Sequence, residues 1–202
     1  ERLHAVVGIS MGGMQALQWV RTRPGFARKA VSIMGTPRAA SRDVALWDAG
    51  LRALDAAGAA GDSGAWTPDT LAGLMALIAL TPEYYRRHLS EENVTRALAD
   101  AQAILAEHNL TDWARQIGAM MGHDVYAGPA ASGKETAAAM RTKLLLIVAR
   151  NDLLVDPRPS LAFAETLKAD TLVLEGECGH FSALCETDRI AKAVSAFLSR
   201  RD

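Results

Sequence analysis

Cysteine is scarce in this 202-residue sequence, which has only two, Cys178 and Cys185. The two could pair with each other. So few cysteines in a chain of this size are, however, typical of a reducing compartment. We therefore expect two unpaired thiols in a cytoplasmic protein.

The sequence also lacks an excess of one charge and has no long apolar run. Its 22 Lys and Arg nearly balance its 23 Asp and Glu, which argues against nucleic acid or an anionic membrane surface as a partner. No stretch approaches the roughly 20 apolar residues of a membrane span, and the amino terminus has no signal-peptide organisation. The expected partners are therefore small molecules.

Half of the residues are apolar, enough for one domain with a substantial core. A buried strand is predicted over Leu3–Ile9, then a helix that ends at Pro24, then a strand over residues 29–34. This strand, helix and strand form a βαβ unit and imply a parallel sheet. The sheet resumes with strands over 143–149 and 171–174, and helices are predicted over 160–168 and 188–199.

Residues 38–142 differ in character from the two flanking regions. Apolar residues at helical spacing predict helices near 41–59, 68–80, 83–88, 91–108 and 111–122. This segment is far longer than a crossover between strands requires. We therefore predict an α/β fold whose core is residues 1–37 and 143–202, with a helical lid over 38–142. Several large side chains could line a pocket beneath the lid, although ordinary helix packing is preferred: Trp47, Trp66, Trp113, Met120 and Met121.

The first strand stops at a serine between two glycines. Gly8 to Gly12 reads GISMG and fits the G-x-S-x-G nucleophile elbow, a sharp turn from strand to helix that exposes the serine oxygen. We expect both glycines to relieve crowding of the strained turn. The N–H of Met11, at the start of the helix, is the expected oxyanion donor.

Three residues that suit acyl-transfer chemistry each follow a predicted strand: Ser10, Asp152 and His180. The carboxyl ends of parallel strands share one edge of a sheet, so these residues should meet there. Ser10 would be the nucleophile, His180 the base, and Asp152 the residue that orients the imidazole. Asp156 is the alternative acid. The other histidines do not follow a predicted sheet strand: His4, His88, His108 and His123. No metal site or bound cofactor is expected.

The segment from Gly8 to Trp19, GISMGGMQALQW, resembles the nucleophile segment of homoserine O-acetyltransferases. Residues 35–38 (GTPR), 123–125 (HDV) and 151–154 (NDLL) agree with the same family. The resemblance extends over essentially the whole chain, aligned with the carboxyl-terminal portion of the family. It implies an α/β-hydrolase fold with a helical lid, an acyl-serine intermediate, a homodimer formed through the lid and acetyl-CoA as a possible acyl donor.

Two departures from the family bear on the substrate. Residues 108–116 read HNLTDWARQ in place of an Arg-Phe-Asp-x-Asn-Ser-Tyr-like stretch, and Phe181 stands where the family commonly has aspartate. Because an apolar ring offers no counter-charge to an ammonium group, homoserine is disfavoured. The expected function is acyl transfer from an ester or thioester to water or another alcohol. The alternatives are a true homoserine O-acetyltransferase of methionine biosynthesis and a non-catalytic binding relative.

The fold that this resemblance implies has further strands beside Leu3–Ile9. Without them the strand would expose an apolar edge that can still form hydrogen bonds. One oxyanion donor normally comes from a loop after an earlier strand. We therefore expect further strands to pack against Leu3–Ile9, supplied by a preceding amino-terminal segment or by a companion chain.

Overall fold

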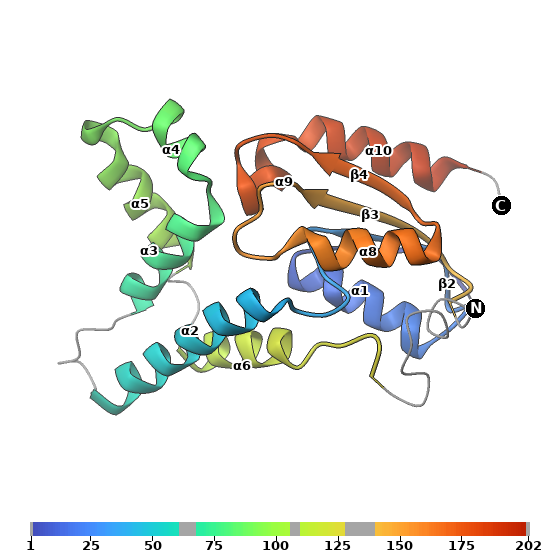
Figure 1. Ribbon diagram of the computed structural model, residues 1–202, viewed down its shortest axis with the longest axis horizontal. Helices are drawn as coiled ribbons and strands as arrows, with labels where there is room; N and C mark the ends of the chain where they lie inside the picture. Colours follow the sequence, from blue (N-terminus) through green and yellow to red (C-terminus); the bar gives the residue numbers. More distant parts are fainter. Residues whose placement is uncertain (1, 61–67, 106–109, 128–139, 201–202) are drawn as a thin grey trace.

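A computed structural model describes residues 2–60, 68–105, 110–127 and 140–200 (Figure 1). Trp66, His108 and the predicted last turn of the helix over 91–108 lie outside these residues. In the described part of the chain, no helix has both the length and the apolar character that crossing a membrane requires.

Among the described residues, four parallel strands form the sheet, in the order β1 (Leu3–Ile9), β2 (Ala27–Ile33), β3 (Lys143–Ala149) and β4 (Asp170–Leu174). Every neighbouring pair is parallel. The prediction of an α/β fold built on a parallel sheet is therefore confirmed. The strand ends agree with the predicted ones to within two residues.

Helices cover both faces of the sheet (Figure 1). On one face, α10 (Thr187–Ser199) buries Ile190 and Phe197 against β2, β3 and β4. On the other face, α1 (Met11–Thr22) and α8 (Pro157–Leu167) bury Leu17 and Phe163 against β2 and β3. α8 begins three residues before the predicted start, because Asp156 caps it and Pro157 suits its first position.

β1 lies at the edge of the described sheet and differs from its neighbours in exposure. Leu3 is 46%, Val7 48% and Ile9 54% exposed, whereas six of the seven residues of β3 are buried. Trp19 of α1 stacks on Phe26 close to this edge, with ring centroids 5.1 Å apart, and both are exposed. Among the described strands, β1 is thus the one with exposed large apolar side chains.

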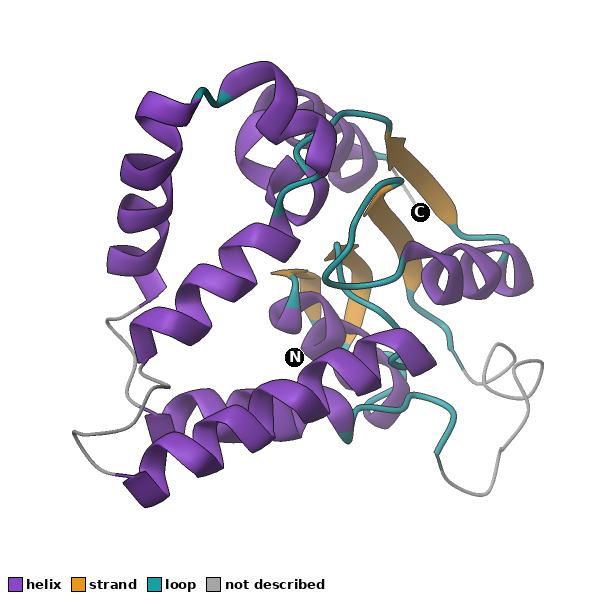
Figure 2. Cartoon of the chain, turned by 60° about the vertical axis from the view of Figure 1, so that its left-hand side comes forward, coloured by secondary structure: helices purple, strands orange, loops and turns teal. Residues whose placement is uncertain are grey.

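In the described part of the chain, five helices separate β2 from β3: α2 (Ser41–Ala60), α3 (Pro68–Ala79), α4 (Pro82–His88), α5 (Glu91–Leu105) and α6 (Leu110–Met121). α2 packs on α6, and α3 packs on α5 (Figure 2). The segment leaves and rejoins the core at one place, where Arg38 and Asp124 form an antiparallel bridge and the Val125 N–H donates to the Pro37 carbonyl at 2.9 Å.

The large side chains of this helical segment pack into a cluster that it shares with the α/β core. Trp47 and Ile117 are each 1% exposed and form a cluster with Met14 and Val155. Trp113, Met120 and Met121 are partly buried against the same cluster. These residues act as helix-packing residues, as preferred from the sequence.

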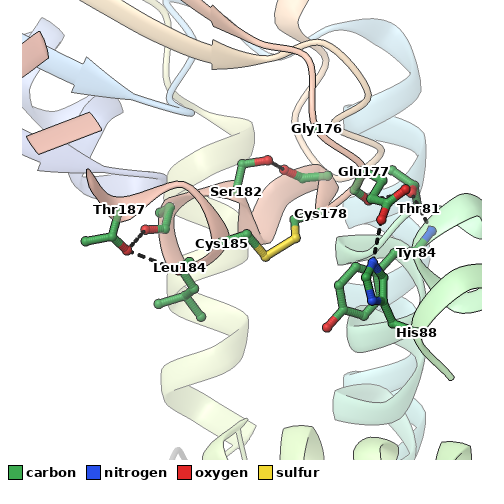
Figure 3. Close-up of a disulfide and its surroundings, with 12 residues drawn as sticks. Thr81, Tyr84, His88, Gly176, Glu177, Cys178, Ser182, Leu184, Cys185 and Thr187 are labelled. Carbon is green, nitrogen blue, oxygen red and sulfur yellow. Dashed lines mark hydrogen bonds and ion pairs between the residues drawn. A yellow bond between two sulfur atoms is a disulfide. The ribbon is translucent and has the colours of Figure 1, made fainter. Parts of the chain in front are cut away.

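The expectation of unpaired cysteines is wrong, because Cys178 and Cys185 form a disulfide (Figure 3). Between them the chain folds into two short helices, η2 (Gly179–Phe181) and α9 (Ser182–Cys185). These tight turns bring the two Cα atoms to 6.4 Å, within the range that a disulfide spans. Disulfides persist mainly in oxidising compartments. The number of cysteines therefore no longer supports the expectation of a cytoplasmic protein.

Candidate active site

Ser10 sits in a sharp turn between β1 and α1. Its backbone has φ 53° and ψ −121°, a conformation that costs free energy for any residue with a side chain. Hydrogen bonds hold the turn on both sides. The Ser10 N–H donates to the Ile33 carbonyl at 2.8 Å, and the Met14 N–H donates to the Ser10 carbonyl at 3.1 Å. Met11 is the first residue of α1, so its N–H belongs to the helix end that favours anions.

The two glycines of the motif have different roles. A Cβ on Gly8 would lie 2.0 Å from the Gly12 carbonyl oxygen, so only glycine fits there. A Cβ on Gly12 would meet nothing within 4 Å. The expectation that both glycines relieve crowding is therefore confirmed for Gly8 and wrong for Gly12. The crowded helical glycine is Gly13, whose Cβ would lie 2.7 Å from Ser32 Oγ.

The structure brings Ser10, Asp152 and His180 into one chain of hydrogen bonds. His180 Nδ1 lies 2.6 Å from Asp152 Oδ2, and His180 Nε2 lies 2.8 Å from Ser10 Oγ. His180 is 9% and Asp152 7% exposed. With the ring proton on Nδ1, donated to the carboxylate, Nε2 is free to accept the serine proton.

The Asp152 carboxylate is fixed by its own loop. Its Oδ1 accepts from the Leu154 N–H at 2.8 Å and from the Val155 N–H at 2.9 Å. The other oxygen, Oδ2, faces His180. Because these two amides hold Oδ1 and His180 contacts Oδ2, the Asp152 carboxylate is held in one orientation toward the ring.

The alternative acid, Asp156, is engaged elsewhere. Its Oδ1 accepts from the Arg158 N–H and from Arg158 Nε, both at 2.9 Å, and the Arg158 side chain lowers the pKa of Asp156. Behind it, burial raises the pKa of Asp43, whose carboxylate accepts from the Asp156 N–H at 3.1 Å. Asp156 thus caps α8, and the acid that contacts His180 is Asp152.

The other described histidines have separate surroundings. His4 Nε2 lies 3.2 Å from the Leu198 carbonyl oxygen, and His88 pairs with Glu177. Burial lowers the pKa of His123, and the nearby backbone of Thr36 partly opposes this shift. In the described part of the chain, the histidine hydrogen-bonded to Ser10 is His180.

The role of Thr81 was missed from the sequence. Its hydroxyl donates to the Glu177 carbonyl oxygen (Figure 3), and a Cβ on Gly179 would lie 3.3 Å from Thr81 Cγ2. Thr81 could be predicted as a helix cap because Pro82 follows it. Its contact with residue 177, across 96 positions, has no local signal. Within the described ranges, no three His, Cys, Asp or Glu side chains are grouped so that they could hold a metal ion.

Comparison with known proteins relates the chain to several enzymes. A family model described as alpha/beta hydrolase fold matches residues 1–186. A stretch of 54 residues is 46% identical to the homoserine O-acetyltransferase of Methanobrevibacter ruminantium, covering 27% of this chain and 11% of that protein. Another of 42 residues is 50% identical to the homoserine O-succinyltransferase of Psychrobacter arcticus, covering 21% of this chain and 9% of that protein.

Solved structures of similar fold include a homoserine O-acetyltransferase and an ester hydrolase. The homoserine O-acetyltransferase from Bacillus anthracis superposes with a TM-score of 0.83 at 21% identity, over 99% of this chain and 61% of that one. An acetylester hydrolase from Corynebacterium glutamicum gives a TM-score of 0.84 at 18% identity, over 98% and 62%. At this identity the likeness shows the fold, and the chain spans about three fifths of either structure.

The family match extends over most of the sequence and agrees with the parallel sheet and the sharp turn at Ser10. The chain therefore belongs to the alpha/beta hydrolase fold family.

Proposed function

We propose that this protein is a serine-nucleophile acyl-transfer enzyme that moves an acyl group from an ester or thioester to water or to an alcohol other than homoserine. The observation that carries the proposal is the continuous hydrogen-bond chain from Ser10 through His180 to Asp152. A nucleophile, a base and a residue that orients the base are the three groups that this chemistry requires.

In the proposed first step, Ser10 Oγ attacks the acyl carbonyl carbon while His180 Nε2 takes the hydroxyl proton. Asp152 stabilises the imidazolium, and the Met11 N–H donates to the oxyanion. The tetrahedral species collapses, and the leaving alcohol or thiol takes the proton from His180. Water or an acceptor alcohol then attacks the acyl-serine, giving its proton to His180, which returns it to Ser10 Oγ.

Phe181, the residue beside the proposed base, indicates which class of acceptor the site suits. Phe181 follows His180 directly and is partly buried in η2. Its ring supplies no charge to pair with the ammonium group of an amino acid, and burying such a group unpaired is costly. An acceptor without an ammonium group suits this position better.

Transfer to homoserine is the second candidate, because the similarity to curated proteins favours it. The matches at 46% and 50% identity are a homoserine O-acetyltransferase and a homoserine O-succinyltransferase. Under this candidate, acetyl-CoA is the acyl donor.

We further propose that the working site includes a strand paired with the exposed edge of β1. The exposed Leu3, Val7 and Ile9 would be covered by such a strand, whether it belongs to the same polypeptide or to another chain. The loop after it would supply the second oxyanion donor. Dimerisation through residues 38–142 remains a prediction from the family resemblance.

The test follows p-nitrophenyl acetate hydrolysis and, separately, acetyl-CoA consumption with and without homoserine. We expect ester hydrolysis that Ser10→Ala removes, and no effect of homoserine on acetyl-CoA consumption. A saturable, homoserine-dependent rate would replace the first candidate by the second. Both candidates would be contradicted if the wild type turned over neither acyl donor. They would also be contradicted if Ser10→Ala turned the donors over as fast as the wild type.

A further inference from the structure

We propose that Thr81, at the corner between α3 and α4, is a positioning residue for His180. It acts through Glu177 and Gly179 and so links the helical segment to the base of the active site. The inference rests on the proposed function, because it assigns Thr81 a part in setting the geometry of that reaction.

The Thr81 hydroxyl forms two hydrogen bonds at once. It accepts from the Tyr84 N–H at 3.1 Å, which caps α4, and donates its proton to the Glu177 carbonyl oxygen (Figure 3). Thr81 is only 5% exposed, so little water is available to replace either partner. Losing the hydroxyl would leave the Tyr84 N–H and the Glu177 carbonyl oxygen without this partner, which costs more than the bond itself contributes where water cannot replace it.

The side chain of Glu177 is held by the same short helix. Its Oε1 pairs with His88 Nε2, and its Oε2 lies 3.2 Å from Arg87 Nη1. Each pair is partly exposed and contributes little to stability by itself. Together with the Thr81 bond, they hold both the backbone and the side chain of Glu177, three residues before His180.

Gly179 brings the backbone next to His180 into direct contact with α3. Its φ is 56°, and a Cβ there would lie 2.6 Å from the Ala79 carbonyl oxygen and 3.3 Å from Thr81 Cγ2. On the other side, the Ser182 hydroxyl donates to the Gly179 carbonyl at 2.8 Å. The turn that carries His180 is therefore packed between the Thr81 corner and its own following helix.

A displacement at this corner should reach the reacting atoms. His180 Nε2 is 2.8 Å from Ser10 Oγ, and a shift of about 1 Å in a catalytic group can cost on the order of a hundredfold in rate. Ser10 lies in the turn between β1 and α1, which is held by separate hydrogen bonds to Ile33 and Met14. A loosened Thr81 corner would thus change the distance between base and nucleophile.

The test compares Thr81→Val, which removes the hydroxyl at nearly constant shape, with Thr81→Ser, which keeps it. Thr166→Val is the matched control, because that exposed hydroxyl donates within its own helix, to the Ala162 carbonyl. Ester hydrolysis is measured well below each variant's unfolding temperature. The downfield proton resonance of the His180–Asp152 hydrogen bond is recorded by NMR on the same samples.

We expect Thr81→Val to lower kcat by about ten- to a hundredfold with KM changed less than about threefold, and to broaden or shift the His180 resonance. Thr81→Ser and Thr166→Val should stay within about twofold of the wild type with an unchanged resonance. Folded Thr81→Val with wild-type kcat and resonance would overturn the proposal. So would equal losses in Thr81→Val and Thr81→Ser.

A second variant keeps the test decisive if Thr81→Val does not fold. Glu177→Gln removes the charge that pairs with Arg87 and His88, and we expect it to lower kcat by about two- to tenfold and to shift the same resonance. Wild-type kcat and resonance in Glu177→Gln would overturn the proposal in that case. Failure of the proposed function can be told apart from failure of the Thr81 proposal. If the proposed function is wrong, the wild type itself shows no ester hydrolysis, while the resonance still reports the position of His180.

Discussion

The two sides of the candidate active site are held in different ways. Asp152 and His180 are buried and tied by side-chain hydrogen bonds, a neighbouring disulfide and the Thr81 corner. Ser10 depends on a strained backbone turn at the end of β1, which lies at the edge of the described sheet and has exposed apolar residues. The acid–base side should therefore respond to changes in side chains, including distant ones, and the nucleophile side to changes in the backbone.

The largest effect is expected from replacing Asp152, the proposed acid. Asp152→Asn should lower kcat about ten-thousandfold, because an amide in place of the carboxylate favours the wrong tautomer of His180. Asp156→Asn is the control, and it should change kcat little, since that carboxylate binds Arg158 and caps α8. Steady-state hydrolysis of p-nitrophenyl acetate measures both. A greater loss in Asp156→Asn than in Asp152→Asn would show that the acid has been misassigned.

The next largest effect is expected in the backbone of the turn at Ser10, where glycine is replaced by alanine at two positions. Gly8→Ala should destabilise the fold by about 3 kcal/mol or more, because its Cβ would overlap the Gly12 carbonyl oxygen. Gly12→Ala, in open space within the first turn of α1, should be neutral or stabilise by up to about 1 kcal/mol. Urea unfolding measures both free energies. Similar values for the two variants would contradict the different roles assigned to these glycines.

A smaller effect concerns the disulfide beside His180. Replacing both cysteines by serine should lower the free energy of unfolding by about 2–3 kcal/mol, the value expected for a short closed loop. It should also lower kcat more than it raises KM, because the bond closes the turn that carries the base. Thermal unfolding and kinetics, with and without a reductant, measure the change. A reductant should change neither the stability nor the kcat of the double variant. If it also left both quantities unchanged in the wild type, the prediction would be contradicted.

Much of the fold could be predicted from the sequence because its signals are local. The apolar run of β3 and the strand-to-helix turn from Gly8 to Gly12 each lie within a few neighbouring residues. The approach of Ser10, Asp152 and His180 could also be predicted, since each follows a strand and parallel strands end at one edge.

The remaining features depend on contacts that have no local pattern. The disulfide requires the turns of η2 and α9 between Cys178 and Cys185, which counting cysteines does not reveal. The different roles of Gly8 and Gly12 depend on where a carbonyl lies after the turn. The Thr81 contact joins residues 96 positions apart.

The central claim is that Ser10 is a nucleophile activated by His180. Its most direct test is covalent labelling with a serine-directed fluorophosphonate, followed by peptide mass spectrometry of the wild type and of Ser10→Ala. We predict one label per chain, on the peptide that contains Ser10, with turnover lost in proportion to labelling and neither label nor turnover in Ser10→Ala. Labelling at another residue, or near-normal turnover by Ser10→Ala, would contradict the account.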